Sequence, residues 1–213
     1  DYNGFTSTDG HRMMFVKRRE KGENGLYCFS KKCFTNNSNN EVINEKFPDY
    51  AGILPISYNY VVSSVNLEAI RIYLTAFQKA GIPNNITHRV SFNYTGHQRI
   101  DFNAELLLEG IEAFMKLGYK KADIGINAQN KAVVFSPEGK INDVHSQGTD
   151  FFLIMPVMPR FKDQEIPSRF YFDLNSECIH TDGIDEEVCL NPVENEKREI
   201  IKIKEDIDKS KAE

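Results

Sequence analysis

The chain offers few residues whose types and spacing suggest catalysis. His11 follows Asp9 by two residues, a combination that could serve acid–base chemistry. Asp101, Glu105 and Glu109 could be considered as metal ligands, but no His stands at ligand spacing beside them. The chain also lacks a Gly-rich phosphate loop, a nucleophile elbow and a pair of catalytic carboxylates. We therefore expect neither an enzyme nor a bound cofactor.

The four cysteines leave a disulfide and a thiol interpretation open. Cys28 and Cys33 lie close together, and Cys178 and Cys189 are further apart. An even count could form two disulfides in a secreted protein, but the first residues have neither the basic start nor the apolar centre of a signal peptide. No apolar run approaches the roughly 20 residues that span a bilayer. We therefore expect a cytoplasmic protein with reduced thiols. The wide spacing of the second pair argues against a zinc site.

Three short stretches indicate a binding surface rather than an active site. They read "TDGHR" from Thr8 to Arg12, "FPDYAGILP" from Phe47 to Pro55 and "MPVM" from Met155 to Met158. Met and Pro provide an adaptable apolar surface, Gly allows close backbone approach, and an Arg or His at the rim can bind a peptide carbonyl or carboxylate. Taken singly, the first could be a hairpin turn with a polar tip and the last a buried strand end. Their joint occurrence favours a docking surface.

Two copies of one supersecondary unit must position these stretches. Each copy runs from a short strand through Asn to an apolar-periodic helix that ends at Gly, and Asn66 to Gly81 has the same spacing as Asn103 to Gly118. Asn caps the first turn of a helix, and Gly accepts the left-handed conformation after the last turn. The apolar faces that we expect in the core comprise Leu67, Ile70, Leu74 and Phe77 in the first helix and Leu107, Ile111, Phe114 and Met115 in the second.

Short β-rich runs separated by turn formers surround the two helices. Three strands follow the second helix in close order, which makes a β-α-β-β-β unit. We expect an α+β fold in which both helices pack side by side on an antiparallel sheet. Beyond Pro159, "SRFYFDLN" looks like one more strand, and the charged end looks like a solvated helix or a disordered tail. The other predicted strands are "NGFTST", "RMMFVKR", "GLYCFS", "ITHRVSFNY", "QRIDF", "ADIGIN", "KAVVFSP" and "DFFLIMPVM".

Composition sets the outer limits of the fold and of its partners. A chain of 213 residues, 40% hydrophobic and 27% charged, can bury one sizeable core and part of a second. Its 26 Lys and Arg residues against 31 Asp and Glu residues give a net charge of −5. Any contact with nucleic acid must therefore come from a local basic patch.

The order of the three stretches resembles the bacterial sliding clamp, the beta subunit of DNA polymerase III. Clamps carry an ATDGHRLA-like stretch, an FPDY-x-x-hydrophobic-Leu-Pro stretch and a V-V-M-P-M-like end, and this chain has "STDGHRMM", "FPDYAGILP" and "FLIMPVM" in that order. The resemblance covers residues 1–158 and implies a DNA clamp fold of repeated β-α-β-β-β units. It implies a partial middle domain at 1–55 and a last clamp domain at 56–158. The extra strand and charged tail expected at 159–213 depart from the family, which usually ends close to residue 158.

In the clamp family the three stretches converge on one pocket, where polymerases, clamp loaders and repair proteins dock a short peptide. Gly52 and Met158 stand where the family usually has Arg, so the preferred partner stays open. Pro48 and Pro55 fix φ, and we expect Phe47–Pro55 to form the crossing between the two domains. The docking residues that the resemblance implies are Thr8, Gly10, His11, Arg12, Met13, Pro48, Ile53, Leu153, Met155, Pro156 and Val157.

Clamps also encircle double-stranded DNA, and cations on the helices that line the hole bind phosphates without reading bases. Two functions therefore remain. One is a processivity factor that forms a homo-oligomeric ring on DNA and recruits partner proteins. The other is a peptide-binding or scaffold module of the clamp fold that does not encircle DNA. The phosphate-binding residues that the resemblance implies, or solvated surface cations otherwise, are Arg71, Lys79, Lys116, Lys120 and Lys121.

Overall fold

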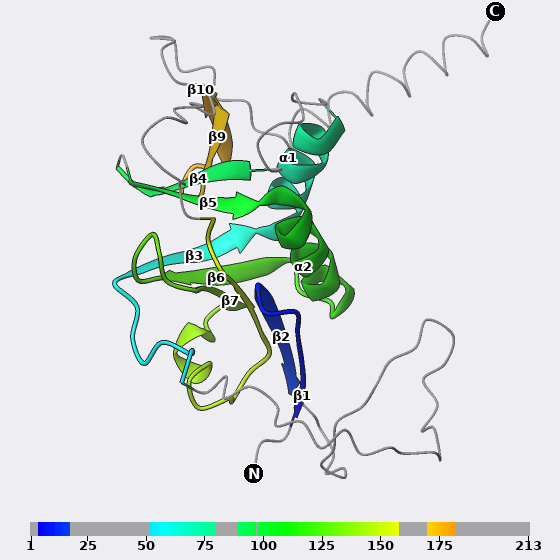
Figure 1. Ribbon diagram of the computed structural model, residues 1–213, viewed down its shortest axis with the longest axis vertical. Coiled ribbons are helices and arrows are strands. Elements are labelled where there is room, and N and C mark those ends of the chain that lie inside the picture. Colours follow the sequence, from blue (N-terminus) through cyan, green and yellow to red (C-terminus); the bar gives the residue numbers. More distant parts are fainter. Residues whose placement is uncertain (1–3, 18–51, 80–88, 97, 158–169, 182–213) are drawn as a thin grey trace, which may run out of the picture.

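The computed structural model describes residues 4–17, 52–79, 89–96, 98–157 and 170–181 (Figure 1). Within these ranges the helices are α1 (Leu67–Lys79), α2 (Ala104–Lys116) and the short 3-10 helix η1 (Ile141–Asp143). The strands are β1 (Gly4–Thr8), β2 (Arg12–Lys17), β3 (Tyr60–Asn66), β4 (Arg89–Thr95), β5 (Gln98–Asn103), β6 (Lys121–Ile126), β7 (Val133–Pro137), β8 (Phe151–Ile154), β9 (Phe170–Asp173) and β10 (Cys178–Thr181).

These strands form two sheets. The six-stranded sheet has the order β1-β2-β8-β7-β6-β3 and is antiparallel throughout. The four-stranded sheet has the order β10-β9-β4-β5, in which β4 and β9 run parallel. The predicted α+β class is confirmed, and the helices α1 and α2 lie side by side along one side of the molecule (Figure 1). The parallel pair departs from the antiparallel sheet that the sequence predicts.

The helix boundaries follow from capping residues. The Asn103 side chain accepts hydrogen bonds from the backbone N–H groups of Glu105 and Leu106, at 3.0 and 3.1 Å, and Asn66 accepts from Glu68 N–H at 3.0 Å. Gly118 follows α2 with a φ of +97°, a conformation that favours glycine. The predicted starts of both helices and the predicted end of α2 are confirmed. Gly81, the predicted end of α1, lies outside the described residues.

Side chains are buried on both faces of the six-stranded sheet because its strands alternate. On the helix side, Phe152 and Ile154 of β8 join a large core with both helices and the four-stranded sheet. On the opposite side, Phe151 and Leu153 join a smaller cluster, which we call the outer cluster. The other members of the outer cluster are Met13, Phe15, Leu54, Ala132, Val134, Ile141 and Val144, with Tyr58 packed against them.

The β9–β10 hairpin belongs to the main core. Phe172 is fully buried there, and the backbone N–H of Leu174 donates to the Asn93 carbonyl at 2.9 Å. The Glu177 carboxylate accepts from the backbone N–H of Asn66, at the start of α1, at 2.7 Å. A strand was predicted in "SRFYFDLN", which β9 confirms, but β10 was not predicted. The division at 158/159 stays a prediction, and residues 170–181 pack with residues of the proposed last domain.

Cys178 corrects one expectation from the sequence. It is disulfide-bonded, whereas the sequence favours reduced thiols. The expectation of reduced thiols came from the lack of a signal peptide. The start of the sequence does not show which cysteine sulfurs lie close together in the fold. The segments around Cys28, Cys33 and Cys189 lie outside the described residues. Among the described helices, none combines the length and the apolar character needed to cross a bilayer.

Candidate functional site

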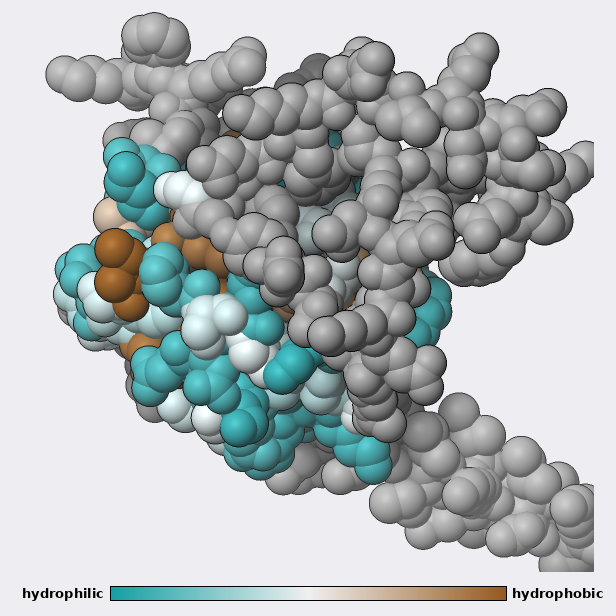
Figure 2. All heavy atoms as spheres, turned by 90° about the horizontal axis from the view of Figure 1, so that it is seen from below, coloured by the Kyte–Doolittle hydropathy of each residue, from teal (hydrophilic) through white to brown (hydrophobic). Residues whose placement is uncertain are grey.

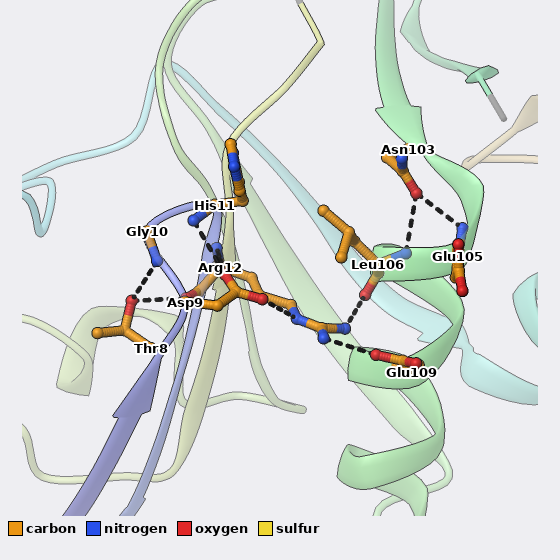
Figure 3. A network of polar contacts seen from close by, with 9 residues as sticks. All are labelled: Thr8, Asp9, Gly10, His11, Arg12, Asn103, Glu105, Leu106 and Glu109. Atoms are coloured by element: carbon orange, nitrogen blue, oxygen red, sulfur yellow. Dashed lines mark hydrogen bonds and ion pairs between the residues drawn. The ribbon is translucent and has the colours of Figure 1, made fainter. Parts of the chain in front are cut away.

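The TDGHR stretch forms the tight connection between β1 and β2. The Thr8 hydroxyl donates to the Arg12 carbonyl at 2.8 Å and accepts from the Gly10 N–H at 3.2 Å. One carboxylate oxygen of Asp9 accepts from the backbone N–H groups of His11 and Arg12, both at 3.0 Å (Figure 3). Gly10 has a φ of +86°, which explains the glycine at this position. Polar side chains therefore fix the turn by binding its own backbone.

Arg12 points to the helix side of the sheet. Its Nε donates to Asp9 at 2.9 Å, one terminal nitrogen donates to the Leu106 carbonyl at 3.0 Å, and the other pairs with Glu109 at 2.6 Å (Figure 3). Burial acts to lower the pKa of Arg12, but its bonds to Glu109 and Asp9 outweigh that effect and raise it. The structure thus places Arg12 against α2, on the face of β2 opposite Met13.

The first and third stretches lie side by side. Strand β2 pairs with β8 so that Met13 is opposite Leu153. Beyond the end of β8, the Met155 N–H donates to the His11 carbonyl at 2.8 Å, and the Val157 N–H donates to the Asp101 carbonyl of β5 at 2.8 Å. The MPV segment is therefore bound at one end to the TDGHR turn and at the other to the second sheet.

An apolar surface lies beside this junction. Met13 and Leu153 are buried in the outer cluster together with Leu54, whereas Met155 and Ile53 are 39% and 51% exposed. Leu54 brings the described part of the FPDYAGILP stretch, residues 52–55, into the same cluster. Seen from below, the molecule shows brown apolar atoms among predominantly hydrophilic ones (Figure 2).

The other residues of the predicted docking set differ in exposure. Gly10 and His11 are exposed at the turn, and Pro156 and Val157 are half-buried. Thr8 is exposed, with its hydroxyl turned to the turn backbone. Pro48 lies outside the described residues, so the predicted crossing at Phe47–Pro55 stays a prediction.

A cavity of about 330 Å³ lies between the β1–β2 hairpin and α2. It was not predicted, because it depends on residues that are about a hundred positions apart in the sequence. Gly110 of α2 admits the Phe152 ring, which a Cβ at that position would overlap. The lining residues are Ser7, Thr8, Asp9, Arg12, Met13, Met14, Glu109, Gly110, Ala113 and Phe152.

Tyr58 packs beside the outer cluster with its ring against Gly125. Its buried hydroxyl has no hydrogen-bond partner among the described residues. Burial raises the pKa of Tyr58 to about 12, because a phenolate would lose its hydration there. This tyrosine therefore packs as a neutral phenol.

The predicted phosphate-binding residues lie on and after the helices. The Leu67 N–H of α1 donates to the Lys120 carbonyl, so the start of α1 adjoins the segment after α2, where Lys116, Lys120 and Lys121 are exposed. Lys121 also donates to the Ser64 hydroxyl at 2.8 Å. Lys79 is exposed at the last turn of α1, away from these residues.

Acidic residues accompany these cations. Arg71 donates to Glu68, one turn earlier, at 2.7 Å, and this bond outweighs burial and lowers the pKa of Glu68. Helix α2 carries Glu105, Glu109 and Glu112. Of the five predicted phosphate-binding residues, Lys116, Lys120 and Lys121 lie near one another in the sequence, at the end of α2 and just after it. No group of three or more His, Cys, Asp or Glu residues within the described ranges is arranged to hold a metal ion.

No protein-family model and no curated protein matches this chain. Solved structures similar to it include the beta subunit of DNA polymerase III from Thermotoga maritima, with 12% identity, a TM-score of 0.42, and coverage of 73% of this chain and 41% of that one. A sliding clamp from Pseudomonas aeruginosa bound to griselimycin has 13% identity and a TM-score of 0.41, covering 72% and 41%. A Helicobacter pylori beta clamp bound to a DNA ligase peptide has 14% identity and a TM-score of 0.41, covering 72% and 40%. This chain spans about two fifths of the length of these clamps.

Proposed function

We propose that this chain is part of a sliding-clamp-like processivity factor of DNA replication that docks short peptides of partner proteins. The observation that carries the proposal is the junction of the first and third stretches, where Met155 N–H binds the His11 carbonyl and Met13 pairs with Leu153. The first and third stretches are more than a hundred residues apart in the sequence, but they lie side by side in the fold. The clamp docking pocket brings together the same two stretches. The docking surface is defined as Met13, Ile53, Leu153 and Met155, with the TDGHR turn at its edge.

The chemistry of this surface suits a peptide with apolar anchors. Met13 and Leu153 form a buried and therefore rigid base, and Met155 adds an exposed, adaptable thioether. A leucine-sized and a phenylalanine-sized anchor would contribute on the order of 3–6 kcal/mol on burial, before the cost of ordering the peptide. Micromolar rather than nanomolar affinity is therefore expected.

Replacing Met155 by Asp should lower peptide affinity at least about tenfold, because the carboxylate would have to lose its hydration under an apolar anchor. The probe is a fluorescent peptide with a polar residue followed by spaced Leu and Phe anchors, titrated in an anisotropy assay. Leu117→Asp is the matched control, since Leu117 is 42% exposed and Met155 39%. It should leave the affinity unchanged. Circular dichroism should show that both variants stay folded.

Two outcomes would contradict the docking proposal. One is that the wild-type chain does not bind the peptide at micromolar concentrations. The other is that Met155→Asp and Leu117→Asp have the same affinity as the wild type.

The DNA part of the proposal rests on the basic end of α2. If Lys116, Lys120 and Lys121 each neutralise a phosphate, the logarithm of the binding constant for double-stranded DNA should fall with the logarithm of salt concentration with a slope of about −2.7. Reversing all three to Glu should abolish this binding and leave peptide affinity unchanged. Anisotropy with two duplexes of unrelated sequence checks both the slope and the lack of base specificity.

A wild-type chain that docks peptide but shows no salt-dependent DNA binding would favour the second function, a scaffold module that does not encircle DNA. The acidic residues on α2 favour this second function, because their negative charges would repel DNA phosphates. The solution mass and shape of the full-length protein decide whether a ring closes.

A further inference from the structure

We infer that Arg12 is a positioning residue of the docking surface, which it serves by fixing the TDGHR turn to α2 rather than by contacting the peptide. This inference rests on the proposed docking function and goes beyond it. It assigns Glu109 and Leu106 of α2, which no sequence motif identified, to the support of that surface.

The Arg12 side chain points away from the outer cluster. Arg12 and Met13 are consecutive in strand β2, so their side chains leave the sheet on opposite faces. Met13 lies in the outer cluster, whereas Arg12 reaches α2. A peptide seated over Met13 would therefore lie on the other side of the sheet from the Arg12 guanidinium.

The Arg12 guanidinium is already bound within the protein. Each of its three nitrogens has an acceptor, in Asp9, the Leu106 carbonyl and Glu109 (Figure 3). Two of these acceptors are carboxylates, and charge-assisted bonds of this kind are stronger than neutral ones. A peptide carboxylate would have to displace one of them to reach Arg12.

Hydrogen bonds also connect α2 to the exposed Met155. Asp9 receives the Arg12 side chain on one oxygen and the backbone N–H groups of His11 and Arg12 on the other. The His11 carbonyl in turn accepts from Met155 N–H. A continuous series of hydrogen bonds therefore runs from Glu109 and Leu106 through the turn to Met155.

The pKa of Asp9 agrees with this arrangement. Burial acts to raise it, but the bonds from His11 N–H, Arg12 N–H and the Arg12 side chain outweigh burial and lower it. Asp9 therefore remains ionised, and able to hold the turn, to a lower pH than an ordinary aspartate.

Glu109→Gln separates positioning from direct contact, because the two roles predict opposite results. Glu109 is on α2, its side chain is 56% exposed, and it lies outside the docking surface. If Arg12 positions the turn, the loss of this ion pair should weaken peptide binding about two- to tenfold. If Arg12 binds the peptide directly, Glu109→Gln would release the guanidinium, and affinity would stay the same or increase.

Three further variants complete the test by peptide titration. Arg12→Gln should weaken binding at least as much as Glu109→Gln, and the double variant should be no weaker than Arg12→Gln alone, since both changes break one connection. Glu105→Gln is the matched control, one turn earlier on the same helix, and should have no effect. Additive losses in the double variant would overturn the inference.

Hydrogen exchange gives a readout that does not depend on the peptide. In Glu109→Gln the amides of His11, Arg12 and Met155 should exchange faster than in the wild type, while the Glu105→Gln chain should match the wild type. Unchanged exchange in Glu109→Gln would overturn the inference even if affinity fell. If the wild type binds no peptide, the proposed function fails and Arg12 loses its docking role, whereas faster exchange would still establish the connection from α2 to the turn.

Discussion

Replacing Phe172 by Ala should lower the free energy of unfolding by about 3–5 kcal/mol, because it removes a fully buried ring from the main core. The Phe172 ring centroid lies 5.4 Å from that of Tyr73 and 5.6 Å from that of Phe92. It thus joins α1, β4 and the β9–β10 hairpin. Urea denaturation followed by circular dichroism measures the change.

Tyr171→Ala is the control for Phe172→Ala, since it alters the neighbouring residue of β9 on the opposite face. Tyr171 stacks with His180 and lies under Arg99, and it is only half-buried, so its loss should cost clearly less than that of Phe172. Phe172→Leu should cost less than Phe172→Ala and remains measurable if the Ala variant does not fold. Equal stabilities for wild type and Phe172→Ala would mean that residues 170–181 are not part of the core.

Gly110→Ala should destabilise the protein by about 1–3 kcal/mol. In an ordinary helix this change would gain nearly 1 kcal/mol through helix propensity. Here a Cβ would overlap the Phe152 ring of β8, which is buried and also packs against Phe135. Thermal unfolding monitored by circular dichroism would measure the loss.

A second substitution distinguishes overlap from other causes in Gly110→Ala. Phe152→Leu removes ring atoms opposite the new Cβ, so Gly110→Ala should cost less in that background than in the wild type. The loss of stability from Gly110→Ala could be the same in both backgrounds, or Gly110→Ala could stabilise the protein. Either result would mean that α2 and β8 do not approach each other closely at Gly110.

The helices were predictable because their signals are local. Each helix start is marked by an adjacent Asn, Asn66 or Asn103, and the end of α2 is marked by Gly118. The apolar periodicity of Leu67–Lys79 and Ala104–Lys116 indicates the buried faces directly. The division into two sheets had no such signal. Strand β9 was recognisable by composition, but its parallel pairing with β4 depends on distant residues. Strand β10 was not predicted from the sequence.

The candidate site was predictable in part. The resemblance grouped Met13 with Leu153, and the pairing of β2 with β8 brings these two together. It also grouped Arg12 with Met13, although strand alternation already implies that neighbours in RMMFVK face opposite ways. The contacts of Arg12 with Leu106 and Glu109 could not be predicted, because the residues are more than 90 positions apart and no motif near Arg12 or near Glu109 indicates the contact.

The parallel pairing of β4 with β9 also has a consequence for synthesis of the chain. Asn93 and its partner Asp173 are 80 residues apart. At about 5–20 residues per second, a ribosome needs about 4–16 s to make the second after the first. Helix α1 has been made before that interval, and β5 and α2 are made within it, but the edge of β4 that pairs with β9 stays open until its end. An open strand edge can pair with another nascent chain, so slow translation between these two residues should favour aggregation on polysomes.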